Sequence, residues 1–422
     1  MRYDGKKVLI LGYGKSGKAC EFFLKERGAD VTVYDDYQTE YSHGNGIDGY
    51  DLAIVSPGVS SRHKMMGLLK KRHIEPISEL DLAYMNCRSK KILAVSGTNG
   101  KTTVCTILYD MLRRVGGASL VGNIGVPFIS EAERIRRNDV VIVEVSSFQI
   151  EQSKVFRPLI AALTNVGEDH LDRHLTKERY RAIKLSLFDR AEIAVANGDD
   201  PNQSRIEKAI SYAIKNENAD YRLCGRDLIT KKGKTKLPPF SRGAAYDVDY
   251  LCAYAVASTV AGERKCFVES YSAVKLPRFR NEYVGELSGG AVYNDSKGTN
   301  IDATLFAISK IEKNMALILG GSDKGEDYAR LMAGLGERVV KVYLVGANAG
   351  DMYRAAAPEV RKKCMPMADL ESCVADFAKT PCPVLLFSPA SASFDLYSGY
   401  QERGEKFNEI LKRYGTVFAE SE

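Results

Sequence analysis

The segment Gly97–Thr103 has the residue types of a loop that binds phosphate. It follows the apolar run Ile92–Val95 and precedes apolar residues at helical spacing, which predicts a strand, a loop and a helix. In such a loop, glycines let backbone N–H groups approach a phosphate, Lys101 can reach the β- and γ-phosphates, and the Thr102 hydroxyl can contact Mg²⁺. The strict pattern G-x-x-x-x-G-K-[ST] fails because Val95 occupies the position of its first glycine. We expect nucleotide binding here; the alternative is a Gly-Lys-Thr sequence without function.

Candidate metal ligands follow the next two strand-like runs. Glu144 lies near the end of the apolar run Val140–Val145, where a carboxylate is costly unless it is paired or bound to metal. The polar segment Asn165–His174 follows the expected strand Leu159–Leu163 and holds two of the five histidines. A lone histidine in such a segment is more often a helix cap or a packed surface residue. The companion carboxylate and the phosphate loop favour a ligand role.

Lys184 lies on the apolar face of an expected helix. Thr176 can serve as the N-cap of this helix. The apolar stripe at helical spacing consists of Tyr180, Ile183, Leu187 and Phe188. A lysine on such a stripe usually extends its ammonium group to solvent while its methylene groups stay buried. Spacing alone does not separate this interpretation from a functional lysine.

A second glycine pattern, Gly12–Gly17, lies near the N-terminus. It follows the apolar run Val8–Leu11, and Asp35 ends the next expected strand, Val31–Tyr34, as in a dinucleotide-binding unit. A complete dinucleotide domain needs a second βαβ half, yet the loop at Gly97 begins only about 80 residues later. We therefore expect a smaller nucleotide or a nucleotide sugar rather than NAD. The alternative is a tight turn that binds nothing.

Alternating strand-like and helix-like runs along the 422 residues would position these loops. This alternation predicts parallel α/β sheets. The expected fold is α/β with three domains: an N-terminal Rossmann-like nucleotide-sugar domain at 1–88, a central P-loop ATPase-like domain at 89–276 and a C-terminal Rossmann-like domain at 277–422. Residues 199–241 are polar and show no motif with a chemical role. Further strands are expected at Leu52–Val55, Ile193–Ala196, Ala316–Leu319, Val340–Val345 and Val384–Phe387.

Composition and charge narrow the class of partner. Sixty Lys and Arg against fifty-four Asp and Glu leave a net charge of +6, which is too weak and diffuse for DNA binding. No apolar run approaches the ~18 residues of a membrane span, and the N-terminus shows no cleavable signal. Nine cysteines without a CxxC pair predict free thiols rather than zinc ligands. We expect a cytoplasmic monomer without nucleic acid or membrane partners.

Together these segments resemble the Mur ligases, and among them the members that add D-glutamate. The resemblance covers nearly the whole chain, and its further segments are Gly122–Gly125, Glu144–Gln149, Tyr293–Asn300, Leu319–Gly325 and Ser388–Asp395. It implies amide synthesis driven by ATP, as a step of peptidoglycan precursor synthesis. The γ-phosphate would activate the alanyl carboxylate of UDP-N-acetylmuramoyl-L-alanine as an acyl phosphate, and the amine of D-glutamate would attack it.

The resemblance also implies roles for individual residues. The catalytic residues would be Lys101, Lys184, His170 and Glu144. Two Mg²⁺ ions would be held by Thr102, Glu144, His170 and Lys184, the last carrying a carbamate. The ATP site would comprise Gly97, Thr98, Asn99, Gly100, Lys101, Thr102, Thr103, Arg280 and Asp295. The UDP-sugar site would comprise Lys15, Ser16, Asp35, Asp36, Gly58, Asn123 and Ser146. D-Glutamate would be bound by Lys297, Thr299, Lys324, Ser393, Phe394 and Tyr400.

The chain departs from the family pattern in three places. The usual H-N-x-x-N is replaced by Tyr246–Tyr250, the usual H-R-x-E becomes Phe279–Glu282, and Tyr37 stands where an arginine is common. The first change loses two amides and brings the carboxylates of Asp247 and Asp249 near a polyphosphate. It predicts weaker ATP binding unless a tyrosine of that segment, Tyr250, stacks on the adenine.

Three alternatives remain at this point. The nearest are another amino-acid-adding Mur ligase and a ligase of the folylpolyglutamate type, although the latter lacks a module like Gly12–Gly17. An alternative of a different class is a non-catalytic relative that binds a UDP-sugar and has a decayed ATP site. The altered segment Tyr246–Tyr250 motivates this last alternative.

Overall fold

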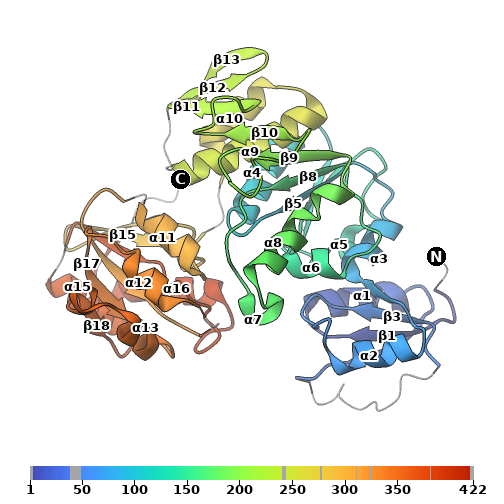
Figure 1. The fold of residues 1–422 in the computed structure, drawn as a ribbon, viewed down its shortest axis with the longest axis horizontal. Helices are drawn as coiled ribbons and strands as arrows, with labels where there is room; N and C mark the ends of the chain where they lie inside the picture. The colour runs from blue at the N-terminus through green and yellow to red at the C-terminus, as the bar shows by residue number, and fades with distance from the viewer. Residues whose placement is uncertain are drawn as a thin grey trace. The chain divides into compact units, whose positions relative to one another are not determined.

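Three β-sheets are found in the part of the chain that the structure describes (Figure 1). This computed structural model describes residues 3–38, 49–239, 244–275, 278–309, 311–323, 326–380 and 382–418, with backbone only at 171, 172, 244 and 245. The chain divides into two compact units. The first contains 1–166 and 178–276, and the second contains 167–177 and 277–422. Each unit is described by itself.

The first sheet is parallel, with the strand order β2-β1-β3-β4. Its strands are β1 (Lys7–Leu11), β2 (Asp30–Tyr34), β3 (Leu52–Val55) and β4 (Pro76–Ser78). Its helices are α1 (Lys15–Lys25), α2 (Lys64–Lys71) and α3 (Glu79–Asn86). The loop between β1 and α1 therefore lies at the carboxyl edge of a parallel sheet, where nucleotide ligands bind in α/β folds.

The central sheet has the strand order β13-β12-β11-β10-β9-β8-β5-β7-β6. Its strands are β5 (Ile92–Ser96), β6 (Ala118–Gly122), β7 (Val140–Glu144), β8 (Ile160–Leu163), β9 (Ile193–Asn197), β10 (Ile210–Ala213), β11 (Tyr221–Cys224), β12 (Asp227–Thr230) and β13 (Gly233–Lys236). Its helices are α4 (Lys101–Arg113), α5 (Phe128–Glu131), α6 (Ser147–Gln152), α8 (Lys177–Leu185), α9 (Ala244–Ala261) and α10 (Lys265–Ala273).

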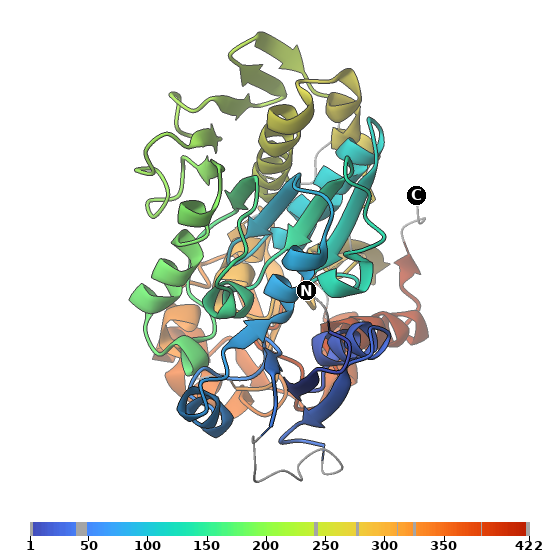
Figure 2. The ribbon, with the colours of Figure 1, turned by 90° about the vertical axis from the view of Figure 1, so that its right-hand side faces the viewer.

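Strand β5 is buried on both faces because helices cover both faces of the central sheet. Its residues alternate between two cores, as the pleat requires. Leu93 and Val95 belong to the core formed with α4, α9 and α10. Ile92 and Ala94 belong to a second core that also contains residues of the first sheet and of α1, α3 and α5. Figure 2 shows the long helix α9, in yellow, beside the central strands.

Within the polar segment 199–241, for which the sequence analysis named no elements, residues 210–236 contain four strands. Strands β10 to β13 extend the central sheet beyond β9. Pairs β11–β12 and β12–β13 are antiparallel, so the central sheet, whose other pairs are parallel, has an antiparallel edge that the sequence analysis did not predict. The strands are four residues long and contribute few buried side chains, among them Tyr212, Leu223 and Leu228. Such short polar strands carry almost no hydrophobic periodicity.

The second unit holds a sheet of order β18-β17-β16-β19-β15-β14-β20. Its strands are β14 (Glu282–Leu287), β15 (Gly290–Asn294), β16 (Met315–Leu319), β17 (Val339–Leu344), β18 (Cys364–Pro366), β19 (Val384–Phe387) and β20 (Val417–Phe418). Its helices are α7 (Leu171–His174), α11 (Ile301–Ser309), α12 (Tyr328–Ala333), α13 (Ala349–Ala355), α14 (Pro358–Arg361), α15 (Leu370–Lys379) and α16 (Tyr400–Arg413). Strands β14 and β20 are antiparallel additions to a parallel core.

The expected strands agree with the observed ones to within one residue at each end. The agreement follows from their continuous apolar runs, of which β5, β7, β16 and β19 are examples. The boundary expected at 276/277 coincides with a boundary between the two units. The boundary expected at 88/89 lies inside the first unit, where the first and central sheets share a core, and it stays a prediction. Among the described residues, no helix is long and apolar enough to cross a membrane.

Glu79 lies inside the shared core of the first unit. It begins α3, is 1% exposed, and its Oε1 accepts a hydrogen bond of 2.9 Å from the backbone N–H of Ile129. Its Oε2 has no hydrogen-bond partner among the described residues. Burial raises the pKa of Glu79 to about 7, against the opposing effect of the amides of Ile129 and Phe128 and of the Gln149 side chain. The carboxyl group therefore keeps its proton in the folded state at mildly acidic pH.

This proton predicts a pH dependence of stability. The folded state retains the proton between pH 4.5 and about 7, whereas the unfolded chain loses it. The free energy of unfolding therefore falls as the pH rises through that window, and Glu79→Gln should abolish that fall, worth about 3 kcal/mol. Urea unfolding at pH 5 and pH 8 measures the difference. The exposed Glu26→Gln serves as control, and an unchanged pH dependence in Glu79→Gln would contradict the argument.

Candidate active site

The phosphate loop joins β5 to α4 and is held against the end of β8. Gly97 and Gly100 have φ angles of 137° and 82°, in the region that favours glycine. A Cβ on Gly97 would lie 1.9 Å from Thr164 Oγ1, and one on Gly100 would lie 2.3 Å from Asp249 Oδ1. The N–H of Thr98 donates to the carbonyl of Asn165 over 2.8 Å. The loop conformation therefore depends on glycine at both positions.

Lys101 folds back over this loop. Its Nζ donates to the carbonyl oxygens of Gly97 and Thr98 over 2.8 and 2.7 Å. Helix α4 begins directly after Gly100, which provides no side-chain cap, so the first N–H groups of the helix point toward the loop. A phosphate at this helix start would meet N–H donors and an ammonium group together. The predicted nucleotide-binding residues Gly97–Thr103 thus lie in one place.

Glu144 lies beside the start of α4. It is 2% exposed, and its Oε2 accepts a 2.8 Å hydrogen bond from Thr102 Oγ1. Its Oε1 accepts a 2.8 Å hydrogen bond from Asn123 Nδ2. The sequence analysis assigned Asn123 to the sugar substrate, and the structure places it on the same carboxylate as Thr102. Hydroxyl and carboxylate oxygens suit Mg²⁺, which binds few protein oxygens and takes the rest from phosphates and water.

Lys184 points into the same loop from α8. It is 2% exposed, and its Nζ donates to Ser96 Oγ over 3.0 Å and to the Gly97 carbonyl over 2.7 Å. Its ammonium group therefore does not extend to solvent, which excludes the interpretation as a surface lysine. Tyr180, one turn earlier, holds its hydroxyl 3.0 Å from Thr98 Oγ1. Helix α8 thus contributes two polar groups to the phosphate loop.

His170 belongs to the second unit, with the segment that contains α7. It has a φ angle of 53°, and its Nε2 lies 3.6 Å from Asp169 Oδ2. Asn300 Nδ2 donates to the same Asp169 oxygen over 3.3 Å. His174, the other histidine of this segment, is fully buried. No group of three or more His, Cys, Asp or Glu side chains suited to a metal is found among the described residues, so the role of His170 stays a prediction.

The predicted uridine residues surround the first glycine loop. Asp35 accepts hydrogen bonds from the N–H groups of Tyr13 (2.6 Å) and Tyr37 (2.8 Å), so it fixes the loop to the end of β2. Asp36 contacts His63 Nε2 over 2.7 Å, a partner that the sequence analysis missed. His63 is the N-cap of α2. Nothing in the sequence around this histidine indicated that it lies beside Asp36.

The other predicted residues of the sugar site lie at the ends of strands. Lys15 begins α1 with an exposed side chain, followed by the partly exposed Ser16. Gly58 lies in the loop after β3. Ser146 follows β7 and caps α6 through a reciprocal pair of hydrogen bonds with Gln149. In the first sheet and the central sheet alike, the polar groups are thus gathered at the carboxyl ends of parallel strands.

The segment that replaces H-N-x-x-N forms the start of α9. Tyr250 is fully buried, its hydroxyl donates to the carbonyl of Phe267 over 3.0 Å, and its ring packs edge-on against Tyr271. It is therefore a core residue and does not offer its ring to an adenine. Asp247 accepts a 2.6 Å hydrogen bond from the Tyr271 hydroxyl. Asp249, beside Gly100, is the carboxylate that lies against the phosphate loop.

Asp295 connects three segments in the second unit. Its Oδ1 accepts from the N–H of Asn281 over 3.0 Å and its Oδ2 from Ser388 Oγ over 2.6 Å. Burial raises its pKa to about 6, against the opposing effect of these hydrogen bonds and of Arg280 and Arg403. Arg280 Nε is buried without a hydrogen-bond partner among the described residues. The predicted pair Arg280 and Asp295 is thus brought together, and the sequence analysis missed Ser388.

The predicted D-glutamate residues follow β15 and β19, except Lys324, which lies outside the described residues. Lys297 Nζ lies 4.0 Å from the centre of the Tyr400 ring. The N–H of Thr299 donates to the carbonyl of Lys297 over 2.8 Å. Ser393 Oγ is buried and has no hydrogen-bond partner among the described residues, and Phe394 beside it is 74% exposed. A buried hydroxyl without a partner is a candidate ligand contact.

Comparison with solved structures and with a family model identifies the fold. The chain is similar to the MurF ligase of Thermotoga maritima, solved in complex with ADP, with a TM-score of 0.63 and 18% identity over 97% of this chain and 96% of that one. Residues 95–251 match the family model described as the Mur ligase middle domain. The three sheets and the phosphate loop therefore form the fold of the Mur ligases.

Sequence comparison narrows this class. The chain is 33% identical over 450 residues to a UDP-N-acetylmuramoylalanine–D-glutamate ligase of Pelotomaculum thermopropionicum, covering 97% of this chain and 98% of the relative. It is 32% identical over 451 residues to the ligase of the same name from Caldicellulosiruptor saccharolyticus, covering 96% and 98%. The chain belongs to the family of UDP-N-acetylmuramoylalanine–D-glutamate ligases. This confirms the resemblance drawn from the sequence.

The buried position of Lys184 predicts a severe loss on its removal. Lys184→Ala should nearly abolish turnover, and added formate or acetate should restore part of it, because the expected carbamate acts as a carboxylate at this position. Lys177→Ala on the same helix, where the lysine is exposed, is the matched control and should stay active. Steady-state phosphate release is measured for Lys184→Ala, for Lys184→Ala with added formate or acetate, and for Lys177→Ala. Near-normal activity of Lys184→Ala would show that the lysine only packs against the loop.

Proposed function

We propose that this chain is an ATP-dependent ligase that joins the amino group of D-glutamate to the alanyl carboxylate of UDP-N-acetylmuramoyl-L-alanine in peptidoglycan synthesis. The observation that carries the proposal is an intact phosphate loop in a chain that matches such ligases from end to end. Lys101, Lys184 and the Thr102–Glu144 pair meet at this loop through hydrogen bonds of 2.7–3.0 Å.

The chemistry proceeds in two steps. An oxygen of the alanyl carboxylate attacks the γ-phosphorus, the bond to the β-phosphate oxygen breaks, and ADP leaves. The amine of D-glutamate then attacks the acyl carbon, the carbon–oxygen bond to phosphate breaks, and the amine loses a proton. Transfer of a phosphoryl group needs positioning and neutralisation of charge more than covalent help from the protein. The amides of the loop and the Lys101 ammonium supply both.

Thr102 and Glu144 would hold one Mg²⁺ and His170 a second, which would neutralise the charge on the transferring phosphate when bound. The structure offers a reason for a carbamate on Lys184. Both Lys101 and Lys184 donate to the single carbonyl of Gly97. Like charges gathered at one acceptor repel each other, and a carbamate would convert one of these cations into an anion.

The two other substrates would bind at the two remaining sheets. Lys15, Ser16, Asp35, Asp36 and Gly58 lie around the first glycine loop and would take the UDP group. The D-glutamate residues would lie after β15 and β19, where Lys297 and the hydroxyls of Thr299 and Ser393 suit a substrate with two carboxylates. We further propose that the protein acts in the cytoplasm, as a monomer.

Phosphate release tests this proposal directly. We expect release that requires both UDP-N-acetylmuramoyl-L-alanine and D-glutamate, and little release when L-glutamate or L-lysine replaces D-glutamate. Lys184→Ala serves as the inactive control. Equal release with L-glutamate would contradict the substrate assignment. UDP-sugar binding without any phosphate release would favour the non-catalytic alternative, which the Asp249 carboxylate at the phosphate loop motivates.

A further inference from the structure

Four of the residues proposed to bind D-glutamate, Lys297, Thr299, Ser393 and Phe394, lie on two loops that leave neighbouring strands of the sheet in the second unit. Strands β15 and β19 are parallel neighbours, with Asn294 opposite Phe387. One loop continues from Asn294 to Thr299 and the other from Ser388 to Phe394. The hydrogen bond between Ser388 and Asp295 joins the loops close to the strand ends. Farther along, where Ser393 and Lys297 lie, another contact must set the distance between them.

Arg403, in the first turn of α16, reaches both loops. Its Nε and Nη2 donate to the hydroxyl and the carbonyl of Ser296 over 3.1 and 2.8 Å. Its Nη1 donates to the carbonyl of Ala392 over 3.0 Å, and Nη2 also donates to the carbonyl of Ser391 over 3.0 Å. Ser296 directly precedes Lys297, and Ala392 directly precedes Ser393. One planar guanidinium group thus spans the two segments just before their predicted ligand residues.

The guanidinium group is nearly inaccessible to water. Arg403 is 3% exposed, and burial lowers its pKa to about 10, against the effect of Asp395, Tyr397 and Asp295. It therefore remains charged at neutral pH. A buried cation that donates to neutral backbone carbonyls is costly, and only good geometry with several acceptors offsets the loss of hydration. Lysine, with a single tetrahedral ammonium group, does not reproduce this planar set of bonds.

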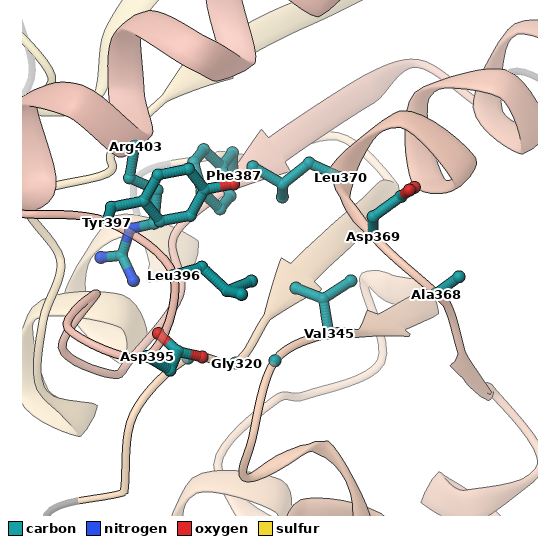
Figure 3. Close-up of a pocket in the computed structure, with 12 residues that line it drawn as sticks. Gly320, Val345, Ala368, Asp369, Leu370, Phe387, Asp395, Leu396, Tyr397 and Arg403 are labelled. Carbon is teal, nitrogen blue, oxygen red and sulfur yellow. The ribbon is translucent and has the colours of Figure 1, made fainter.

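A cavity lies beside Arg403 and is lined by Asp395, Leu396 and Tyr397, which directly follow the second loop. Figure 3 shows the cavity, where Leu396 and Val345 face one another and Arg403 lies beside Tyr397. Gly320 and Gly321, which follow β16, also line it. The second loop and the residues after it are tied to Ser322, whose N–H donates to the Ala392 carbonyl over 2.9 Å and whose hydroxyl accepts from the Asp395 N–H over 2.8 Å. These bonds do not reach the first loop, whereas those of Arg403 reach Ser296.

We infer that Arg403 is a positioning residue for the amino-acid substrate, because it sets the separation between the loop of Lys297 and the loop of Ser393. This inference rests on the proposed function. We assign Arg403 no contact with the substrate, because it is 3% exposed and four of its five N–H groups donate to the hydroxyl and carbonyl of Ser296 and to the carbonyls of Ser391 and Ala392. Its effect should appear in the binding of D-glutamate and not in that of ATP or of the UDP-sugar.

The test compares two Arg→Lys variants of the same unit. Arg361 on α14 also donates to three backbone carbonyls, over 2.8–3.2 Å, but joins no predicted ligand segment. We expect Arg403→Lys to raise the KM for D-glutamate at least tenfold and to leave the KM values for ATP and the UDP-sugar within about twofold. Arg361→Lys should leave all three KM values within the same limit.

Three further outcomes bear on the inference, and a fourth bears on the proposed function. An unchanged KM for D-glutamate in Arg403→Lys contradicts it. Loss of cooperative thermal unfolding in both Arg403→Lys and Arg403→Gln, but not in Arg361→Lys, would show that the residue only stabilises the fold. Partial rescue of the D-glutamate KM in Arg403→Ala by added guanidinium supports it, because the cavity borders the vacated position. Absence of D-glutamate-dependent phosphate release in the unaltered protein would instead refute the proposed function.

Discussion

The close packing of two glycines is the constraint on which the phosphate loop depends. Gly97 presses against Thr164 and Gly100 against Asp249, at distances that leave no space for a Cβ. This packing brings the Gly97 carbonyl to the ammonium groups of both Lys101 and Lys184. It also starts α4 at the point where Thr102 meets Glu144. Cations, N–H donors and a carboxylate therefore gather around one short turn of backbone, which is the arrangement that transfer of a phosphoryl group requires.

The fold was predictable where apolar runs are long and was missed where they are short. Strands β5, β7, β16 and β19 are buried on both faces, so their sequences are continuous apolar runs that leave little doubt. Strands β10 to β13 carry polar residues on exposed faces and show no clear period, so the sequence analysis named no strands there. The shared core between the first two sheets joins residues distant in sequence, and no local pattern reveals it.

The site was predictable in its composition but not in its contacts. Glycines followed by a lysine and a threonine indicated the phosphate loop, and the resemblance indicated Glu144 and Lys184. The burial of Lys184 decided between the two interpretations of this residue, and that burial depends on contacts with Ser96 and Gly97, which are distant in sequence. Tyr250 is a second example: the sequence left open whether its ring could stack on adenine and offset the lost amides, and the structure places that side chain in the core. Contacts such as those of Arg403 join segments about 100 residues apart and follow only from the tertiary structure.

The central claim is that the alanyl carboxylate is activated by phosphoryl transfer at the loop of Gly97 and Lys101. The most direct test uses UDP-N-acetylmuramoyl-L-alanine with ¹⁸O at both oxygens of its alanyl carboxylate, together with ATP and D-glutamate. Isotope shifts in the ³¹P NMR spectrum of the released phosphate report the fate of the label. The account predicts one ¹⁸O atom in each phosphate, because the bond between the acyl carbon and the phosphate oxygen breaks in the second step. Unlabelled phosphate, released while the amide product forms, would contradict it.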